Sequence, residues 1–212
     1  MPVQVNPNRM ELLRLKRKQL VARRGHKLLK DKLEGLLRDF MRIVREYREL
    51  RRAVDGEIGT VFAGLVRASA GMDAAAFRVA LAFPSCTAHL AVQERLVMNV
   101  RVPVFRFSLE GSMVSYGLAD TNRDLDRAMG MVREALARMV RLAEVEKTIE
   151  LVAAEIERTR RRVNALEYIL IPQLVGARKF IQAKLDEDER ASRIRNMKVK
   201  ELLEKAAAQG SR

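Results

Sequence analysis

The sequence is poor in the residues that fill compact cores and tight turns. It has no Trp, only five Pro, and aromatic residues make up 5% of its 212 positions. Leu, Ala, Arg, Lys, Glu, Val and Met dominate instead, which is the composition of long helices and coiled coils. A lone cysteine, Cys86, excludes an intramolecular disulfide and suits a reducing compartment. We therefore expect an elongated, mainly helical fold.

Several functional classes are disfavoured by what the chain lacks. No stretch approaches the ~20 apolar residues of a membrane span, and the segment from Met1 to Arg9 has no apolar signal core. There is no Cys-His cluster, no paired-carboxylate pattern, and Gly59–Gly64 lacks the Lys-Ser/Thr of a phosphate loop. We expect a cytoplasmic protein that does not insert into the membrane and has no catalytic residues, cofactor or metal.

The charge is strongly basic and unevenly spread. The formal net charge is +14, of which residues 1–67 carry +9, residues 68–119 carry +1 and residues 120–212 carry +4. Such an excess suits nucleic acid, an anionic membrane surface or an acidic protein cavity. Composition alone leaves these three open.

A long helix is predicted over residues 8–66, within a first domain of residues 1–67. Asn8 is a candidate N-cap, with Glu11 as its capping-box partner. Some 58 residues without proline would make a helix of roughly 90 Å. Gly25 interrupts good helix formers, either as a tolerated surface glycine or, as we prefer, where a partner backbone approaches. The apolar seam steps by three or four residues through Leu12, Leu15, Gln19, Ala22, His26, Leu29, Leu33, Leu36, Phe40, Ile43, Tyr47, Leu50, Val54, Ile58, Val61 and Leu65.

Residues 68–119 read as a connector with a short helix and a β-hairpin. The helix is expected over residues 74–82, ended by Pro84. The hairpin is expected over about residues 97–118, with a turn at 108–112 and a return strand at 113–116. Pro103 predicts an edge strand. The candidate hairpin residues are Val102, Phe105, Phe107, Gly111, Val114 and Tyr116.

A second long helix is predicted within residues 120–212, with Asp120 or Thr121 as N-cap, a kink after Ile171 at Pro172 and a frayed tail. Its central seam has a mean step of 3.5, which is the repeat of a left-handed coiled coil. That seam runs through Leu142, Val145, Ile149, Val152, Ile156, Thr159, Val163, Leu166 and Leu170.

The reversal in the connector makes the two long helices antiparallel neighbours. Pairing Leu65 with about Leu125 makes paired residue numbers sum to roughly 190, so His26 faces the region of Val163 and Asn164. Both termini then lie at one tip and the hairpin at the other. We interpret His26 and Asn164 as polar residues that fix helix register; a proton relay or metal site is the minor alternative.

Three stretches now carry a family resemblance. Asn6–Leu13 and Arg24–Lys32 resemble the N-terminal signature of the D subunit of the V-type and archaeal A-type rotary ATPases, and Arg160–Tyr168, followed by Ile171 and Pro172, resembles its C-terminal signature. Asn8 stands where that family commonly has Thr, and both residues can cap a helix. The match covers both ends of the chain in the right order.

The resemblance implies a non-catalytic rotor shaft in the central stalk, peripheral to the membrane. Its expected partners are the F subunit, the three catalytic A and three B subunits, and the funnel-shaped subunit that caps the membrane rotor, with no nucleic acid. The family's hairpin is associated with stimulating ATP hydrolysis. The expected interface and register residues are Arg9, Met10, Arg24, Gly25, His26, Lys27, Arg161, Arg162, Asn164, Tyr168 and Pro172. Candidate contacts to the F subunit, where the second seam changes phase, are Met129, Val132, Arg133, Leu136, Met139 and Val140.

Two other classes compete with this interpretation. A basic coiled coil can bind nucleic acid, but here the basic residues are interleaved with acidic ones, and Phe and Tyr mostly occupy seam or hairpin positions. Tight DNA binding that falls steeply with salt would favour that class. A generic scaffold would instead form stable homodimers alone.

Overall fold

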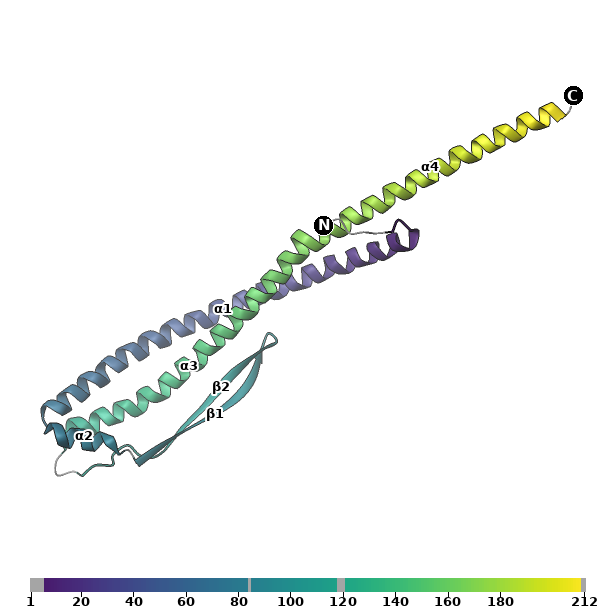
Figure 1. Ribbon diagram of the computed structural model, residues 1–212. Coiled ribbons are helices and arrows are strands. Elements are labelled where there is room, and N and C mark those ends of the chain that lie inside the picture. The colour runs from purple at the N-terminus through teal and green to yellow at the C-terminus, as the bar shows by residue number, and fades with distance from the viewer. Residues whose placement is uncertain (1–5, 84, 118–120, 211–212) are drawn as a thin grey trace. The chain divides into compact units, whose positions relative to one another are not determined.

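A computed structural model describes residues 6–83, 85–117 and 121–210, with side chains as far as residue 203. The chain is mainly helical: two long helices are packed together, and a short helix and an antiparallel β-hairpin lie between them in the chain (Figure 1). This confirms the predicted fold class. The elements are α1 (Arg9–Ala70), α2 (Ala74–Ala82), β1 (Ser85–Val97), β2 (Val100–Ser112), α3 (Arg123–Asn164), the π-helical turn η1 (Ala165–Leu170) and α4 (Ile171–Gly210).

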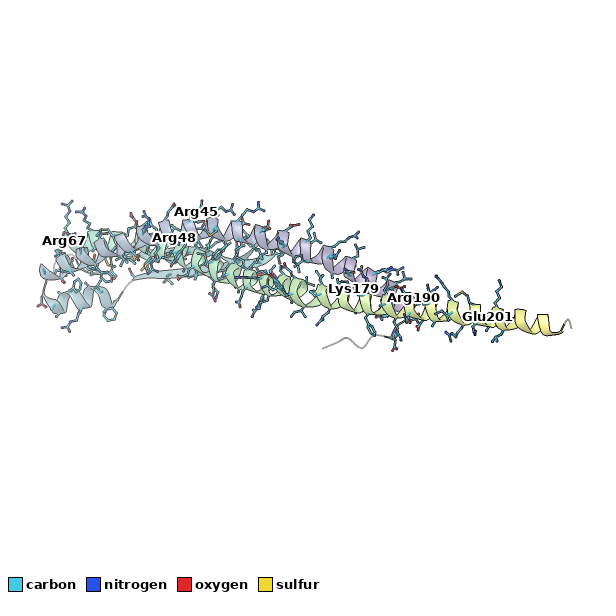
Figure 2. All side chains as sticks on the ribbon, turned by 90° about the horizontal axis from the view of Figure 1, so that it is seen from above. Arg45, Arg48, Arg67, Lys179, Arg190 and Glu201 are labelled. Atoms are coloured by element: carbon cyan, nitrogen blue, oxygen red, sulfur yellow. The ribbon has the colours of Figure 1, made fainter. Side chains whose placement is uncertain are left out.

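Two compact units make up the chain, and each is described by itself. The end unit combines Met1–Leu33 with Arg158–Arg212, and the connector unit comprises Glu34–Glu157. In the connector unit, Arg45, Arg48 and Arg67 project from the exposed face of α1, and in the end unit Lys179, Arg190 and Glu201 project from α4 (Figure 2). These six charged residues therefore lie on the outer helix faces, as an amphipathic seam requires.

Polar caps fix where the long helices start. The Asn8 side-chain oxygen accepts a hydrogen bond from the Met10 N–H at 3.2 Å, which confirms the predicted cap of α1. The cap of α3 is Asn122, whose side-chain oxygen accepts the Leu125 N–H at 3.0 Å. Thr121 was therefore the wrong choice, and Asp120 lies outside the described residues. Asn122 also donates to the Ala68 carbonyl at 3.0 Å, which ties the start of α3 to the end of α1.

The predicted seam lies on the buried side of α1, and in α3 its residues from Leu142 to Val163 are buried or half-buried, whereas Leu170 is 41% exposed. None of the α1 seam residues from Leu12 to Leu65 is exposed. Ion pairs between the helices report their register. In the connector unit Glu57 pairs with Arg138, and Glu46 with Arg141 at 3.0 Å. In the end unit Arg9 pairs with Glu189 at 2.6 Å. The residue numbers of these partners sum to between 187 and 198, close to the predicted 190.

The hairpin differs from the prediction in its turn. β1 and β2 pair from Ser85 opposite Ser112 to Val97 opposite Val100, so the two-residue turn is Met98-Asn99. Both turn residues have positive φ, 49° and 66°, which is the geometry that matches the twist of a hairpin. The expected span of 97–118 and the turn at 108–112 were therefore wrong.

Three of the predicted hairpin residues take other places as a result. Gly111 lies inside β2 opposite Cys86 with φ +94°, and a Cβ there would stand 2.3 Å from the Ser85 carbonyl oxygen. Val114 and Tyr116 follow the strand. Val102, Phe105 and Phe107 also lie in β2.

The hairpin turn is anchored in the core of the connector unit. Leu36, Val100, Val102 and Val152 are buried together, and Phe40, Val97, Leu151 and Ile156 pack around them. A Cβ on Gly35 would stand 2.4 Å from the Met98 methyl carbon. Gly35 thus leaves room on α1 for the tip of the hairpin, whereas Gly25, where we expected a close approach, has nothing within 4 Å of its Cβ position.

Helical structure continues through Pro172, and the irregular turn precedes it. Residues Ala165–Leu170 form a π-helical turn, closed by a hydrogen bond from the Ile171 N–H to the Leu166 carbonyl. Proline cannot donate to the carbonyl four residues back and its ring collides with it. The extra residue in the π turn accommodates that collision. The expected interruption after Ile171 therefore takes the form of a wider turn before it.

Candidate functional site

Arg24–Lys32 of the N-terminal signature and Arg160–Tyr168 of the C-terminal signature lie side by side in the end unit. His26 Nε2 is 3.4 Å from the Glu167 carboxylate, and both belong to those stretches. Asn164 is exposed and makes no capping bond, so the polar contact to His26 comes from Glu167. The register-fixing role of His26 and Asn164 stays a prediction. The other expected interface residues, Arg9, Met10, Arg24, Lys27, Arg161, Arg162 and Tyr168, are exposed on the helix surfaces.

A buried polar contact in the same unit was not predicted. Gln19 is only 5% exposed within the seam, and its side-chain oxygen accepts a hydrogen bond from Arg178 at 3.1 Å. A buried amide needs such a partner, so this contact favours one alignment of α1 and α4. A polar residue at a seam position is the sequence signal that could have identified Gln19.

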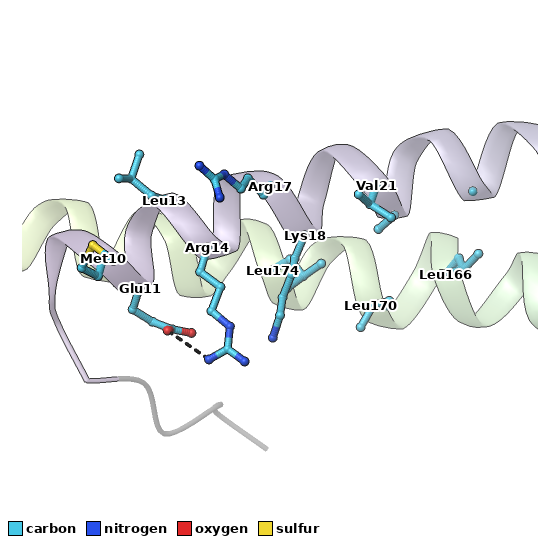
Figure 3. Close-up of a pocket in the computed structure, with 12 residues that line it drawn as sticks. Met10, Glu11, Leu13, Arg14, Arg17, Lys18, Val21, Leu166, Leu170 and Leu174 are labelled. Atoms are coloured by element: carbon cyan, nitrogen blue, oxygen red, sulfur yellow. Dashed lines mark hydrogen bonds and ion pairs between the residues drawn. The ribbon is translucent and has the colours of Figure 1, made fainter.

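An apolar groove of about 890 Å³ lies between α1 and the η1–α4 segment (Figure 3). Leu166, Leu170 and Leu174 line one side. Along α1 the lining changes from Met10, Glu11 and Leu13 through Arg14, Arg17 and Lys18 to Val21, Ala22 and Gly25. The groove therefore combines an apolar wall with a wall that carries three basic residues and one acidic residue, inside the unit that holds both signatures.

A smaller apolar groove lies between α1 and α3 in the connector unit. Its volume is about 230 Å³. Three of the six candidate contacts to the F subunit line it, namely Val132, Leu136 and Met139, together with Ile58, Val61, Phe62 and Ala135. Met129 instead packs against the buried cluster of Ala68, Ala80 and Leu125. Arg133 is exposed and Val140 half-buried, and neither lines the groove.

Glu144 holds the hairpin against α3. Its carboxylate accepts the Phe105 backbone N–H at 2.8 Å and also pairs with Arg141. Glu144 is 5% exposed. The unpaired edge of β2 is thus satisfied at this point by a side chain of the long helix. Glu144 could not be identified from the sequence, because one carboxylate beside a seam position resembles any solvated helix residue.

The segment after the hairpin is tied to α3 by one tyrosine. The Tyr116 hydroxyl donates to an Asp126 carboxylate oxygen at 2.8 Å. Partial burial and this hydrogen bond raise the pKa of Tyr116 to about 12, from an ordinary value of 10.0. The folded state therefore favours the neutral phenol.

This shift predicts an alkaline loss of stability. A tyrosine whose pKa is raised by folding contributes stability that is complete below pH 10 and lost as pH rises from 10 toward 12. We expect the difference in thermal midpoint between the parent chain and Tyr116→Phe to shrink over this window. Thermal unfolding followed by circular dichroism at several pH values measures it, and a difference that stays constant from about pH 9 to about pH 12 would contradict the assignment.

Within the described residues, no group of three or more His, Cys, Asp or Glu side chains could hold a metal ion. The same part of the chain contains no helix long and apolar enough to cross a membrane.

Comparison with known proteins identifies the family. The family model described as the D subunit of ATP synthase matches residues 11–201. The V-type ATP synthase D subunit of Clostridium botulinum (strain ATCC 19397 / Type A) is 44% identical over 209 residues, covering 96% of this chain and 97% of the relative. That of Thermoanaerobacter sp. (strain X514) is 44% identical over 205 residues, covering 96% and 98%. The chain therefore belongs to the D-subunit family of V-type ATP synthases.

Proposed function

We propose that this chain is the rotor subunit of the central stalk of a V-type or A-type ATPase. It transmits torque between ATP hydrolysis or synthesis in the ring of three A and three B subunits and ion translocation by the membrane rotor. The observation that carries this is the family membership along nearly the whole chain. The long seamed helices suit the role, since α1 runs unbroken from Arg9 to Ala70.

Two paired helices would give the shaft its stiffness. Torque can pass along a helix only if the helix resists twisting and bending, and a partner helix packed on a continuous seam adds that resistance. An asymmetric shaft would make different contacts with each catalytic site as it turns. Each site would then favour a different conformation, which is coupling by differential contact. The chain itself takes no part in the chemistry.

The partners follow from the same proposal. The end unit, with its signature residues, would lie within the catalytic ring. The F subunit would bind the small apolar groove between α1 and α3, and the funnel-shaped cap subunit would connect the shaft to the membrane rotor. We place the chain on the cytoplasmic side, peripheral to the membrane, and we expect it to bind no nucleic acid.

The proposed F-subunit site gives a direct prediction. Phe62 lines the small groove and is 63% exposed in the free chain. Replacing it with aspartate places a charge on an apolar contact, so we expect Phe62→Asp to lose about tenfold or more of its affinity for the F subunit. Met41→Asp is the control, because Met41 is 53% exposed on α1 outside this groove. Co-expression followed by size-exclusion chromatography and titration measures both variants, and equal affinities would contradict the site.

The rotor function itself is tested by single-molecule rotation. The ring of A and B subunits is assembled with this chain and the F subunit and then immobilised. A bead is attached to the connector unit of this chain. Unidirectional, ATP-dependent rotation of the bead is the expected result. A chain that stays fixed to the ring while ATP is hydrolysed would refute the proposal.

A further inference from the structure

The end unit contains few buried apolar side chains. Among the residues whose side chains the structure describes, they are Leu15, Val163 and Ile181, whereas the connector unit has fourteen. The difference is visible along α1, which is described over its full length. The part of α1 in the end unit, from Arg9 to Leu33, contributes one buried apolar residue, and the part in the connector unit contributes five. Because apolar burial is the main stabilising term, we expect the helices of the end unit to be held together less strongly.

The seam of the end unit also buries polar atoms that have no partner. Thr159 is 1% exposed, and its hydroxyl makes no hydrogen bond. Arg178 donates from Nη1 to Gln19, but its buried Nε is unpartnered. In the part of the chain that the structure describes, these two are the only buried side-chain atoms of this kind. Such an atom costs free energy in the packed state that it does not cost in water, so both favour separation of the helices.

The connector unit shows the opposite pattern. Among its described residues, the buried polar side chains are Glu144 and Thr148. The Thr148 hydroxyl donates to the Glu144 carbonyl at 2.9 Å, and the Glu144 carboxylate accepts the Phe105 N–H at 2.8 Å. The connector unit is therefore held by a larger apolar core in which the buried polar groups are satisfied.

The backbone of the end unit has a weak point where η1 meets α4. Pro172 has no N–H, so it cannot donate an intrahelical hydrogen bond. The turn before it is π-helical, a geometry that helices rarely adopt. Tyr168 and Ile169 in this turn are exposed, so their side chains add little apolar burial to offset the missing bond.

We propose that the end unit is a conformational device with two states, in which its helices are paired or separated while the connector unit stays folded, and that the polar groups of its seam set the balance. Polar contacts hold the paired state across the helices, namely Gln19 with Arg178 and His26 with Glu167. A molecule that binds only the paired state would draw the equilibrium toward it. The inference concerns the free chain and does not depend on the proposed rotor function.

Hydrogen exchange of the free, full-length chain, measured residue by residue, tests for the two states. We compare the amides of Val163 and Ile181 in the end unit with those of Leu142 and Val152 in the connector unit, all of which are buried helix residues. After correction for intrinsic rates, the end-unit amides should exchange about tenfold faster or more. Equal protection in the two units would mean that the chain opens as one body and would overturn the proposal.

A pair of threonine variants tests the role of the polar seam. Thr159→Val removes the unpartnered hydroxyl and keeps the shape of the side chain. We expect the Val163 amide to exchange about tenfold more slowly in this variant, because a group that opposes pairing is gone. Thr148→Val is the matched control, since that hydroxyl is also buried but has a partner, and it should not slow exchange at Val163. No slowing in Thr159→Val would refute the proposed cause.

A change in the connector unit tests whether the end unit opens separately. Leu36→Ala removes a fully buried side chain of the connector core. It should speed exchange at Val152 by about tenfold or more and leave exchange at Val163 within about twofold. Ile43→Val makes a milder change in the same unit and gives the same contrast on a smaller scale if Leu36→Ala does not fold. Equal acceleration at Val152 and Val163 in Ile43→Val would show a single cooperative unit and overturn the proposal.

Discussion

Replacing Leu36 with alanine is expected to lower the free energy of unfolding of the connector unit by about 2–5 kcal/mol. Leu36 is fully buried, where α1 meets Val152 of α3 and Val100 and Val102 of the hairpin. Alanine removes the side chain that these three elements share, so the loss combines lost apolar burial with a cavity.

The neighbouring residue provides the control. Leu37 is 43% exposed on the same helix, and Leu37→Ala makes the same chemical change away from the core. We expect it to alter stability by less than about 1 kcal/mol. Chemical denaturation followed by circular dichroism compares the two variants. Equal midpoints for both would mean that the hairpin does not pack on this core.

The long helices and their pairing could be predicted because their signal is repeated many times. The apolar residues from Leu12 to Leu65 recur at steps of three or four. Because the repeat is long, one misassigned position does not change the predicted face of the helix. The antiparallel register follows from the chain reversal in the connector, which pairs Leu65 with about Leu125. Contacts such as Glu57 with Arg138 then fall near the expected numbers.

The hairpin register could not be predicted because its turn has no glycine. Met98-Asn99 takes two positive φ values, and only Asn99 belongs to a residue type that adopts them readily. Gly111 looked like the turn residue, but its positive φ serves a close approach to Ser85 within the ladder. Local turn chemistry therefore pointed to the wrong end of β2.

Surface grooves and contacts are harder to predict from the sequence than the apolar seams. Leu170 continues the heptad pattern, yet it lies at the end of the π turn and lines the groove. Glu144 is another case, because its importance comes from a backbone N–H that another element brings to it. Both depend on how strain and unpaired groups are resolved in three dimensions, which no periodic pattern records.

Glu144 gives the second large prediction. Its carboxylate is the partner of the Phe105 N–H at 2.8 Å, and it is nearly inaccessible to water. Hydrogen bonds to a charged group contribute about 1.5–3 kcal/mol, and a buried donor left without a partner is costly. Glu144→Leu removes the acceptor and leaves the N–H unpaired, so the edge of β2 should separate from α3 more often.

We expect the Phe105 amide to exchange with solvent about 10–100-fold faster in Glu144→Leu, because each 1.4 kcal/mol of local opening free energy is about a factor of ten. Glu46→Gln is the matched control. It removes the other carboxylate that pairs with Arg141. The Glu46 side chain is 47% exposed, and a surface ion pair contributes little to stability. Hydrogen exchange measured residue by residue decides the matter: if the Phe105 amide is equally protected in both variants, packing on Leu36 alone holds the hairpin in place.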